Sequence, residues 1–146
     1  MAEPLSVIAS VIAVIATAAT CAENLSRIIQ DIRHAPDELL ALSNEINNVR
    51  STVDDAKVAC TCLATASSST TKFIETLERL LKEAERVLDD LNRLVSEYNS
   101  KPHIRNRSLW WIRHKNTTKQ HLMTLRKIRC SISELLTSAN VSVLLL

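Results

Sequence analysis

The sequence predicts an all-α protein, an antiparallel bundle of four main helices around an aliphatic core. A short fifth helix is the alternative. The 146 residues contain no glycine, the residue that most readily adopts the positive φ of tight turns. Hairpins built on such turns are therefore not expected. Only four residues are aromatic, which leaves the core to aliphatic side chains. Several long segments repeat apolar residues every three and four positions, as packed helices do. This length predicts one domain, residues 1–146.

The first predicted helix, residues 5–33, begins with an apolar run. From Pro4 to Ala22, nineteen residues include no Asp, Glu, Lys or Arg. Such a helix is ~28 Å long at ~1.5 Å per residue, close to the hydrocarbon thickness of a bilayer. We expect it to be buried at the centre of the bundle, apolar on all sides because neighbours surround it. The alternatives are a permanent transmembrane span and a helix that enters a membrane only when triggered.

The second helix, residues 36–66, opens at Pro36, since the residue before a proline leaves the α region. Its apolar residues form one seam with a period of 3.5: Leu39, Leu42, Ile46, Val49, Val53, Ala56, Cys60 and Leu63. The third helix, residues 71–98, follows a Ser/Thr run that supplies its N-cap. It carries a main stripe of Phe73, Leu77, Leu80, Ala84, Val87, Leu91, Leu94 and Tyr98. A second stripe of Ile74, Leu81, Leu88 and Val95 predicts that this helix faces two neighbours.

The C-terminal part is predicted to be a basic, irregular connector followed by one more helix. The connector covers residues 101–116 and contains Trp110 and Trp111. The last helix covers residues 117–140, and its apolar stripe consists of Leu122, Leu125, Ile128, Ile132, Leu135 and Leu136.

Charge is divided unevenly along the chain. Residues 1–100 carry nine Lys/Arg and fifteen Asp/Glu, whereas residues 101–146 carry nine Lys/Arg and one acid, Glu134. The basic part is therefore expected either to lie against the acidic faces of the second and third helices or to meet an anionic membrane surface. Nucleic acid is the least favoured partner, because stacking aromatics are few and no binding motif is present.

No motif predicts catalysis, so we expect no enzyme activity, no cofactor and no metal site. Without glycine a phosphate-binding loop is not expected, and no zinc-protease or nucleophile-elbow motif occurs. Cys60 and Cys62 lie ~200° apart on a helix and lack the C-x₂-C spacing of zinc sites. The four cysteines are interpreted as buried thiols in a reducing compartment. No cleavable signal peptide is expected, since no basic region precedes the apolar run. The expected location is the cytoplasm, with recruitment to the plasma membrane as an option.

Several segments in order resemble the fungal HeLo-like N-terminal domains of NLR/STAND receptors and ankyrin-repeat proteins. The same type is named after the N-terminus of azaphilone pigment cluster protein L. The opening MAEPLSVI, Met1 to Ile8, looks like the start of such domains. DIRHAPDEL, Asp31 to Leu39, is similar to their I-x-x-A-P-x-E-I junction. The similarity continues at Leu42, Glu45, Val49, Leu109, Trp110 and Trp111, and in LRKIRCSI, Leu125 to Ile132.

The resemblance implies a helical bundle that signals or executes regulated cell death, with an apolar first helix that targets membranes. Family members commonly carry glycines in this helix, where this chain has the stiffer Ala9, Ala13 and Ala16. The predicted membrane contacts are Val7, Ile8, Val11, Ile12 and Ile15. The predicted anionic-surface contacts are Arg105, Arg107, Arg113, Lys115, Trp110 and Trp111. The alternative is a protein-interaction or oligomerisation module that self-associates or binds another signalling domain.

Overall fold

Four long helices make up the fold, which a computed structural model describes over residues 4–31, 37–63, 71–100 and 104–144. For residues 4, 5, 31, 62, 63, 71, 104–110 and 139–144, only the backbone is described. The helices are α1 (Pro4–Asp31), α2 (Asp37–Leu63), α3 (Thr71–Asn99) and α4 (Ile104–Leu144). The predicted all-α bundle is confirmed, and the first three predicted helices agree closely with α1, α2 and α3.

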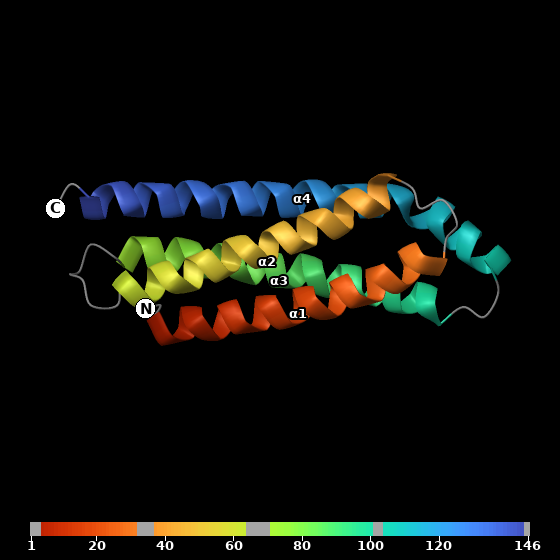
Figure 1. Ribbon diagram of the computed structural model, residues 1–146, viewed down its shortest axis with the longest axis horizontal. Helices are drawn as coiled ribbons and strands as arrows, with labels where there is room; N and C mark the ends of the chain where they lie inside the picture. Colours follow the sequence, from red (N-terminus) through yellow and green to blue (C-terminus); the bar gives the residue numbers. More distant parts are fainter. Residues whose placement is uncertain (1–3, 32–36, 64–70, 101–103, 145–146) are drawn as a thin grey trace.

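Consecutive helices run in opposite directions and form a four-membered ring (Figure 1). α1 packs on α2 and α3, and α4 packs on the same two helices from the other side. The pairs α1/α4 and α2/α3 therefore lie diagonally across the bundle. As a consequence, α1 runs parallel to its neighbour α3, and α2 runs parallel to its neighbour α4 (Figure 1).

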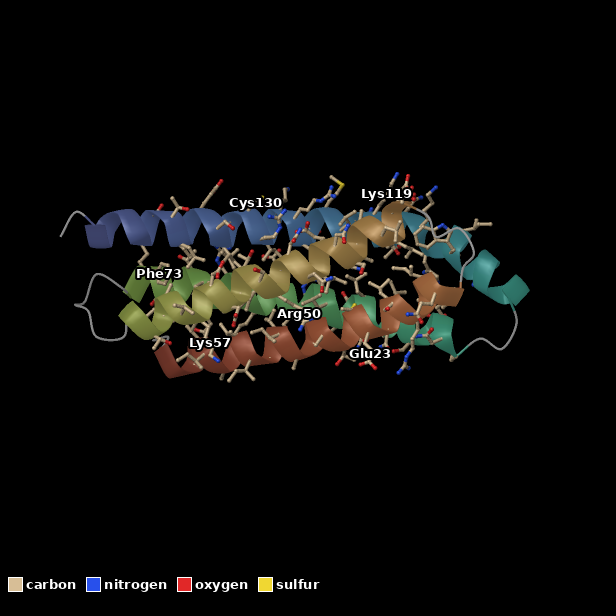
Figure 2. The ribbon with its side chains drawn as sticks, in the orientation of Figure 1. Glu23, Arg50, Lys57, Phe73, Lys119 and Cys130 are labelled. Atoms are coloured by element: carbon tan, nitrogen blue, oxygen red, sulfur yellow. The ribbon has the colours of Figure 1, made fainter. Side chains whose placement is uncertain are left out.

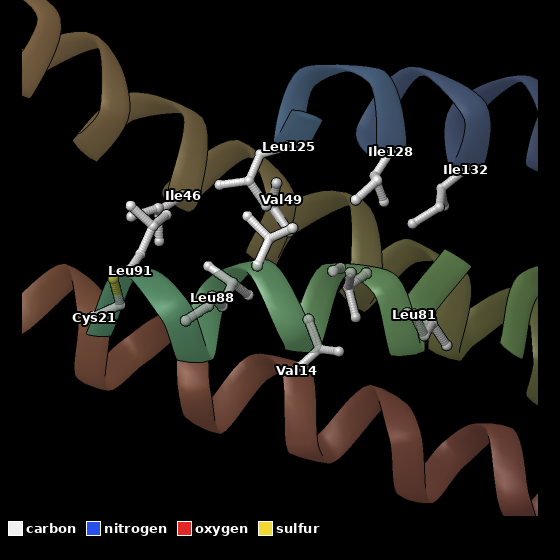
Figure 3. Packing of buried hydrophobic residues seen from close by; sticks show 14 of the residues in the cluster. Val14, Cys21, Ile46, Val49, Leu81, Leu88, Leu91, Leu125, Ile128 and Ile132 are labelled. Carbon is white, nitrogen blue, oxygen red and sulfur yellow. The ribbon is translucent and has the colours of Figure 1, made fainter. Parts of the chain in front are cut away.

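The predicted apolar seams form the core. On α1, buried positions alternate in steps of four and three: Val7, Val11, Val14, Ala18, Cys21, Leu25 and Ile28. The α2 seam is buried from Leu39 to Cys60, while the Leu63 side chain lies outside the described residues. Figure 3 shows Leu88 and Leu91 of α3 between α1 below and the apolar side chains of α2 and α4 above. Both stripes of α3 are used, because this helix faces α1 and α4.

The prediction that α1 is buried on all sides is wrong. Only 28% of its most apolar 18-residue window is buried, and Ile12 is 55% exposed. The reason is the ring arrangement, which places each helix at a corner where two neighbours cover one stripe. Ala9 and Ala16 lie on the exposed side. Alanine is suited to the exposed side of a helix because it has the highest helix propensity and exposes little apolar surface.

The predicted irregular connector is also wrong, because α4 is helical from Ile104 onward. Polar, basic residues without apolar period suggested a loop over residues 101–116, yet no proline or glycine follows Pro102. Once the packed part of α4 has formed, each further residue adds a hydrogen bond without a new nucleation cost. α4 therefore extends to 41 residues, longer than the 28 residues of α1.

Candidate functional site

The predicted membrane contacts on α1 divide into two groups. Val7 and Val11 are fully buried in the core. Ile12 is exposed, while Ile8 and Ile15 are half-buried, and Ile15 packs against the core. Ile8, Ile12 and Ile15 follow one another by four and three residues, so they share one flank of the helix. We call these three residues the α1 flank. In the folded protein the α1 flank is therefore at least partly accessible, whereas Val7 and Val11 could contact a membrane only if α1 left the core.

Two hydroxyl side chains in the apolar part of α1 have hydrogen-bond partners within the helix itself. The hydroxyls of Thr17 and Thr20 donate to the carbonyls of Ala13 and Ala16, at 2.9 and 3.1 Å. Such bonds remove much of the cost of placing a hydroxyl in an apolar environment.

Near each end of α1, a side-chain hydrogen bond between described residues joins it to α3. The Ser6 hydroxyl donates to Glu78 at 2.9 Å, and Asn24 Nδ2 donates to Asn92 Oδ1 at 2.9 Å. Between these two bonds, the buried side of α1 consists of apolar side chains and Cys21. The contact of α1 with the bundle is thus mainly hydrophobic.

The predicted anionic-surface contacts are only partly placed by the structure. The side chains of Arg105, Arg107 and Trp110 lie outside the described residues. Arg113 is exposed, whereas Trp111 is half-buried and packs against the core.

Lys115 of the same predicted set is turned toward α2. Its Nζ lies 3.6 Å from Glu38 Oε1. A backbone hydrogen bond at the start of α2, together with Lys115 and Lys119, lowers the pKa of Glu38. The expectation that the basic segment lies against the acidic face of the second helix is therefore met at this position.

A second contact between α2 and α4 meets the same expectation, although the burial of Glu45 was not predicted from the sequence. Glu45 is only 3% exposed, and its carboxylate accepts hydrogen bonds from Arg129 Nε at 2.6 Å and from a terminal nitrogen of Arg129 at 3.4 Å. Arg126 Nε lies 3.6 Å from the same carboxylate. The hydrogen bond to Glu45 raises the pKa of Arg129. Glu45 directly precedes Ile46 of the seam, which is the signal that could have indicated its burial.

The cysteines and His121 are dispersed across the fold. Cys21 and Cys60 are buried as predicted, and burial raises the pKa of the Cys60 thiol. Cys130 is exposed, contrary to prediction, because it lies off the Ile128–Ile132 stripe. Burial lowers the pKa of His121, and Asp90 acts in the opposite direction. Within the described ranges, no three His, Cys, Asp or Glu residues come together as metal ligands.

A groove between α3 and α4 collects charged side chains of both signs. Arg79 and Glu83 line it from α3, and Lys127 and Glu134 line it from α4. Its lining contains hydroxyls and apolar residues but no histidine or cysteine.

These observations define a small helical bundle whose N-terminal helix is unusually apolar. Ser6–Gln30 is long and apolar enough to cross a membrane, a property that core helices of soluble proteins and signal sequences share. A family model for the N-terminal region of the pigment biosynthesis cluster protein PigL matches residues 2–142. The chain belongs to this family, a fungal N-terminal domain type. No curated protein and no solved structure matches the chain.

Proposed function

We propose that this protein is a non-catalytic cytoplasmic signalling domain that keeps α1 against the bundle and transfers it to a membrane when triggered. The observation that carries the proposal is the position of α1. A stretch of nineteen residues without a charged side chain lies at a corner of the bundle and is covered by only two helices. Its Thr17 and Thr20 hydroxyls already have partners within the helix.

The remaining helices would keep contacts with one another if α1 left. α4 packs on both α2 and α3, so these three helices still share an interface. The departure of α1 would expose apolar surface on α2 and α3 and would remove five large side chains from the core: Val7, Val11, Val14, Leu25 and Ile28. Each contributes ~1.5–3 kcal/mol when fully buried. Because the total is comparable to the stability of a typical domain, α1 stays in place until a membrane or a partner compensates for the loss.

An interaction module is the second candidate, and the α1 flank favours it. Ile12 is exposed in the folded bundle, with Ile8 and Ile15 beside it. An apolar flank of this kind can pack on a helix of a second copy or of another signalling domain without any rearrangement.

Leakage of vesicles that contain phosphatidylserine tests the proposal, with Ile12→Asp as the informative variant. Ile12 is 55% exposed, so the substitution is expected to leave the bundle folded. An aspartate near the centre of a membrane-spanning helix costs roughly 2.5–3.5 kcal/mol. We therefore expect wild type to release trapped dye and Ile12→Asp to release it at least about tenfold more slowly, since ~1.4 kcal/mol corresponds to a factor of ten.

Val58→Asp is the matched control, because Val58 is 62% exposed on α2. It should leak like wild type, and urea unfolding should show that both variants are folded. Equal leakage by wild type and Ile12→Asp would contradict the proposal. If no form leaks and wild type forms oligomers that Ile12→Asp dissociates, the interaction module is the better account.

A further inference from the structure

The outward side of α4 combines exposed apolar and basic side chains. Ile112 is 72% exposed and Met123 is 65% exposed. Eleven residues, about three helical turns, separate them, so they lie on one line along the helix. Lys119, Arg126 and Lys127 are exposed on either side of this line. We call these five residues the α4 outer face.

Positive charge on α4 exceeds what the rest of the bundle neutralises. Between residues 111 and 138, α4 carries six Lys/Arg and one acid, Glu134. The carboxylates of Glu38 and Glu45 pair with three of these, Lys115, Arg126 and Arg129. Arg113, Lys119 and Lys127 form no ion pair with any side chain that the structure describes. Because the three carboxylates of Glu38, Glu45 and Glu134 face six cations, α4 keeps a net positive charge.

We infer that the α4 outer face docks the folded bundle on an anionic bilayer. Basic side chains near an anionic leaflet each gain about fivefold in binding. Apolar side chains between them can enter the headgroup region, as in helices that lie in the membrane interface. The exposed apolar side chains of Ile112 and Met123 favour a bilayer over nucleic acid as the partner. Binding to the phosphates of nucleic acid depends on basic side chains and does not require exposed apolar ones.

The arrangement of the four helices determines where α1 lies relative to the bilayer when the bundle docks through α4. α1 and α4 lie diagonally, each contacting α2 and α3 (Figure 1). Figure 2 shows Lys119 on the α4 edge of the molecule and Glu23 on the opposite, α1 edge. A bundle docked through α4 therefore holds α1 on the side away from the bilayer. This inference rests on the proposed function, because it makes recruitment through α4 a step that precedes the release of α1.

Co-sedimentation with vesicles measures the recruitment step. Lys119→Ser combined with Lys127→Ser is expected to weaken binding to phosphatidylserine vesicles roughly 25-fold, two basic residues at about fivefold each. Lys57→Ser combined with Lys72→Ser is the matched control, since both lysines are exposed on other helices. The control should bind like wild type, and vesicles of phosphatidylcholine alone should bind weakly. Equal losses in both double variants, or no loss in the Lys119/Lys127 variant, would overturn the inference.

An environment-sensitive dye reports which side of the bundle meets the lipid. Cys130 is exposed seven residues after Met123, two turns further along the same line, and can carry the dye in a Cys62→Ser background. The comparison protein carries the dye at Ala16→Cys, on the exposed side of α1, with Cys130→Ser added. We expect the Cys130 dye to shift on binding, before any leakage, and the Ala16 dye to shift only with leakage. A shift at Ala16 first would overturn the inference. Binding through α4 without leakage at any stage would instead contradict the proposed function and leave the inference standing.

Discussion

Glu45 is the residue whose environment departs most from what its type predicts. A carboxylate that is 3% exposed would carry a large desolvation penalty without partners, and Arg126 and Arg129 of α4 supply them. The contact spans 84 positions in the sequence. It fixes the register of α4 against α2, because a shift by one residue would carry both guanidinium groups away from the carboxylate.

Glu45→Gln should therefore destabilise the bundle. The amide cannot accept two charge-assisted hydrogen bonds, so a buried polar group loses part of its pairing. Arg129 and Arg126 are themselves 30% and 53% exposed, and water can partly replace the lost partner. We expect a loss of about 1–3 kcal/mol in the free energy of unfolding, measured by urea denaturation. Glu75→Gln, at an exposed position of α3, is the control and should change stability by less than about 0.5 kcal/mol. A similar small change at Glu45 would show that the pair contributes nothing to stability.

At this scale the sequence predicts burial well where a residue lies on an apolar stripe. The seams of α2 and α3 are predictable because apolar residues that recur every three or four positions share one face of a helix, and that face packs against the core. Glu45 and Cys130 were missed for opposite reasons. Glu45 is polar but lies beside the seam, whereas Cys130 is apolar in character but lies off the stripe.

Among the elements, α3 is the helix whose two stripes meet α1 on one side and α4 on the other. Leu88 belongs to its second stripe and is fully buried (Figure 3). Its loss would leave a cavity between helices that cannot all move inward together, so the site relaxes only partly.

We expect Leu88→Ala to lower the free energy of unfolding by ~2–5 kcal/mol. Leu40→Ala makes the same chemical change on α2, where the leucine is 42% exposed, and should cost less than about 1 kcal/mol. Thermal or urea unfolding of the two variants measures the difference. If both substitutions had the same effect, the packing of α3 against its neighbours would be wrong.

For α1 and α4, the sequence pattern predicts a helix but not how many neighbours cover α1 or where α4 begins. An apolar run specifies that a helix avoids water but not how many neighbours will cover it. The outer side of α1 carries alanines and hydroxyls that tolerate exposure, together with Ile12. The start of α4 has no apolar period because little of the bundle extends beside it, yet nothing in its sequence breaks a helix.

On the scale of the whole molecule, the diagonal placement of α1 and α4 is the property that the stripes could not predict. Two stripes on α3 indicate two neighbours but do not say which helices these are. Because α1 and α4 do not share an interface of any size, the molecule has an apolar side and a basic side that point in opposite directions. The recruitment that we propose for one side and the insertion that we propose for the other are then separate steps, each with its own residues.

A cross-link that holds α1 on α3 tests most directly whether α1 must leave the bundle. Asn24 and Asn92 form a 2.9 Å hydrogen bond between these helices, so Asn24→Cys and Asn92→Cys can be joined by a short bifunctional thiol reagent in a Cys62→Ser, Cys130→Ser background. The control joins α2 to α4 through Glu38→Cys and Lys115→Cys, which replace an ion pair of 3.6 Å and leave α1 free. The measurement is dye release from phosphatidylserine vesicles. We expect the α1–α3 cross-link to abolish release and the α2–α4 cross-link to preserve it. Release at the wild-type rate with α1 locked in place would show that α1 need not leave the bundle.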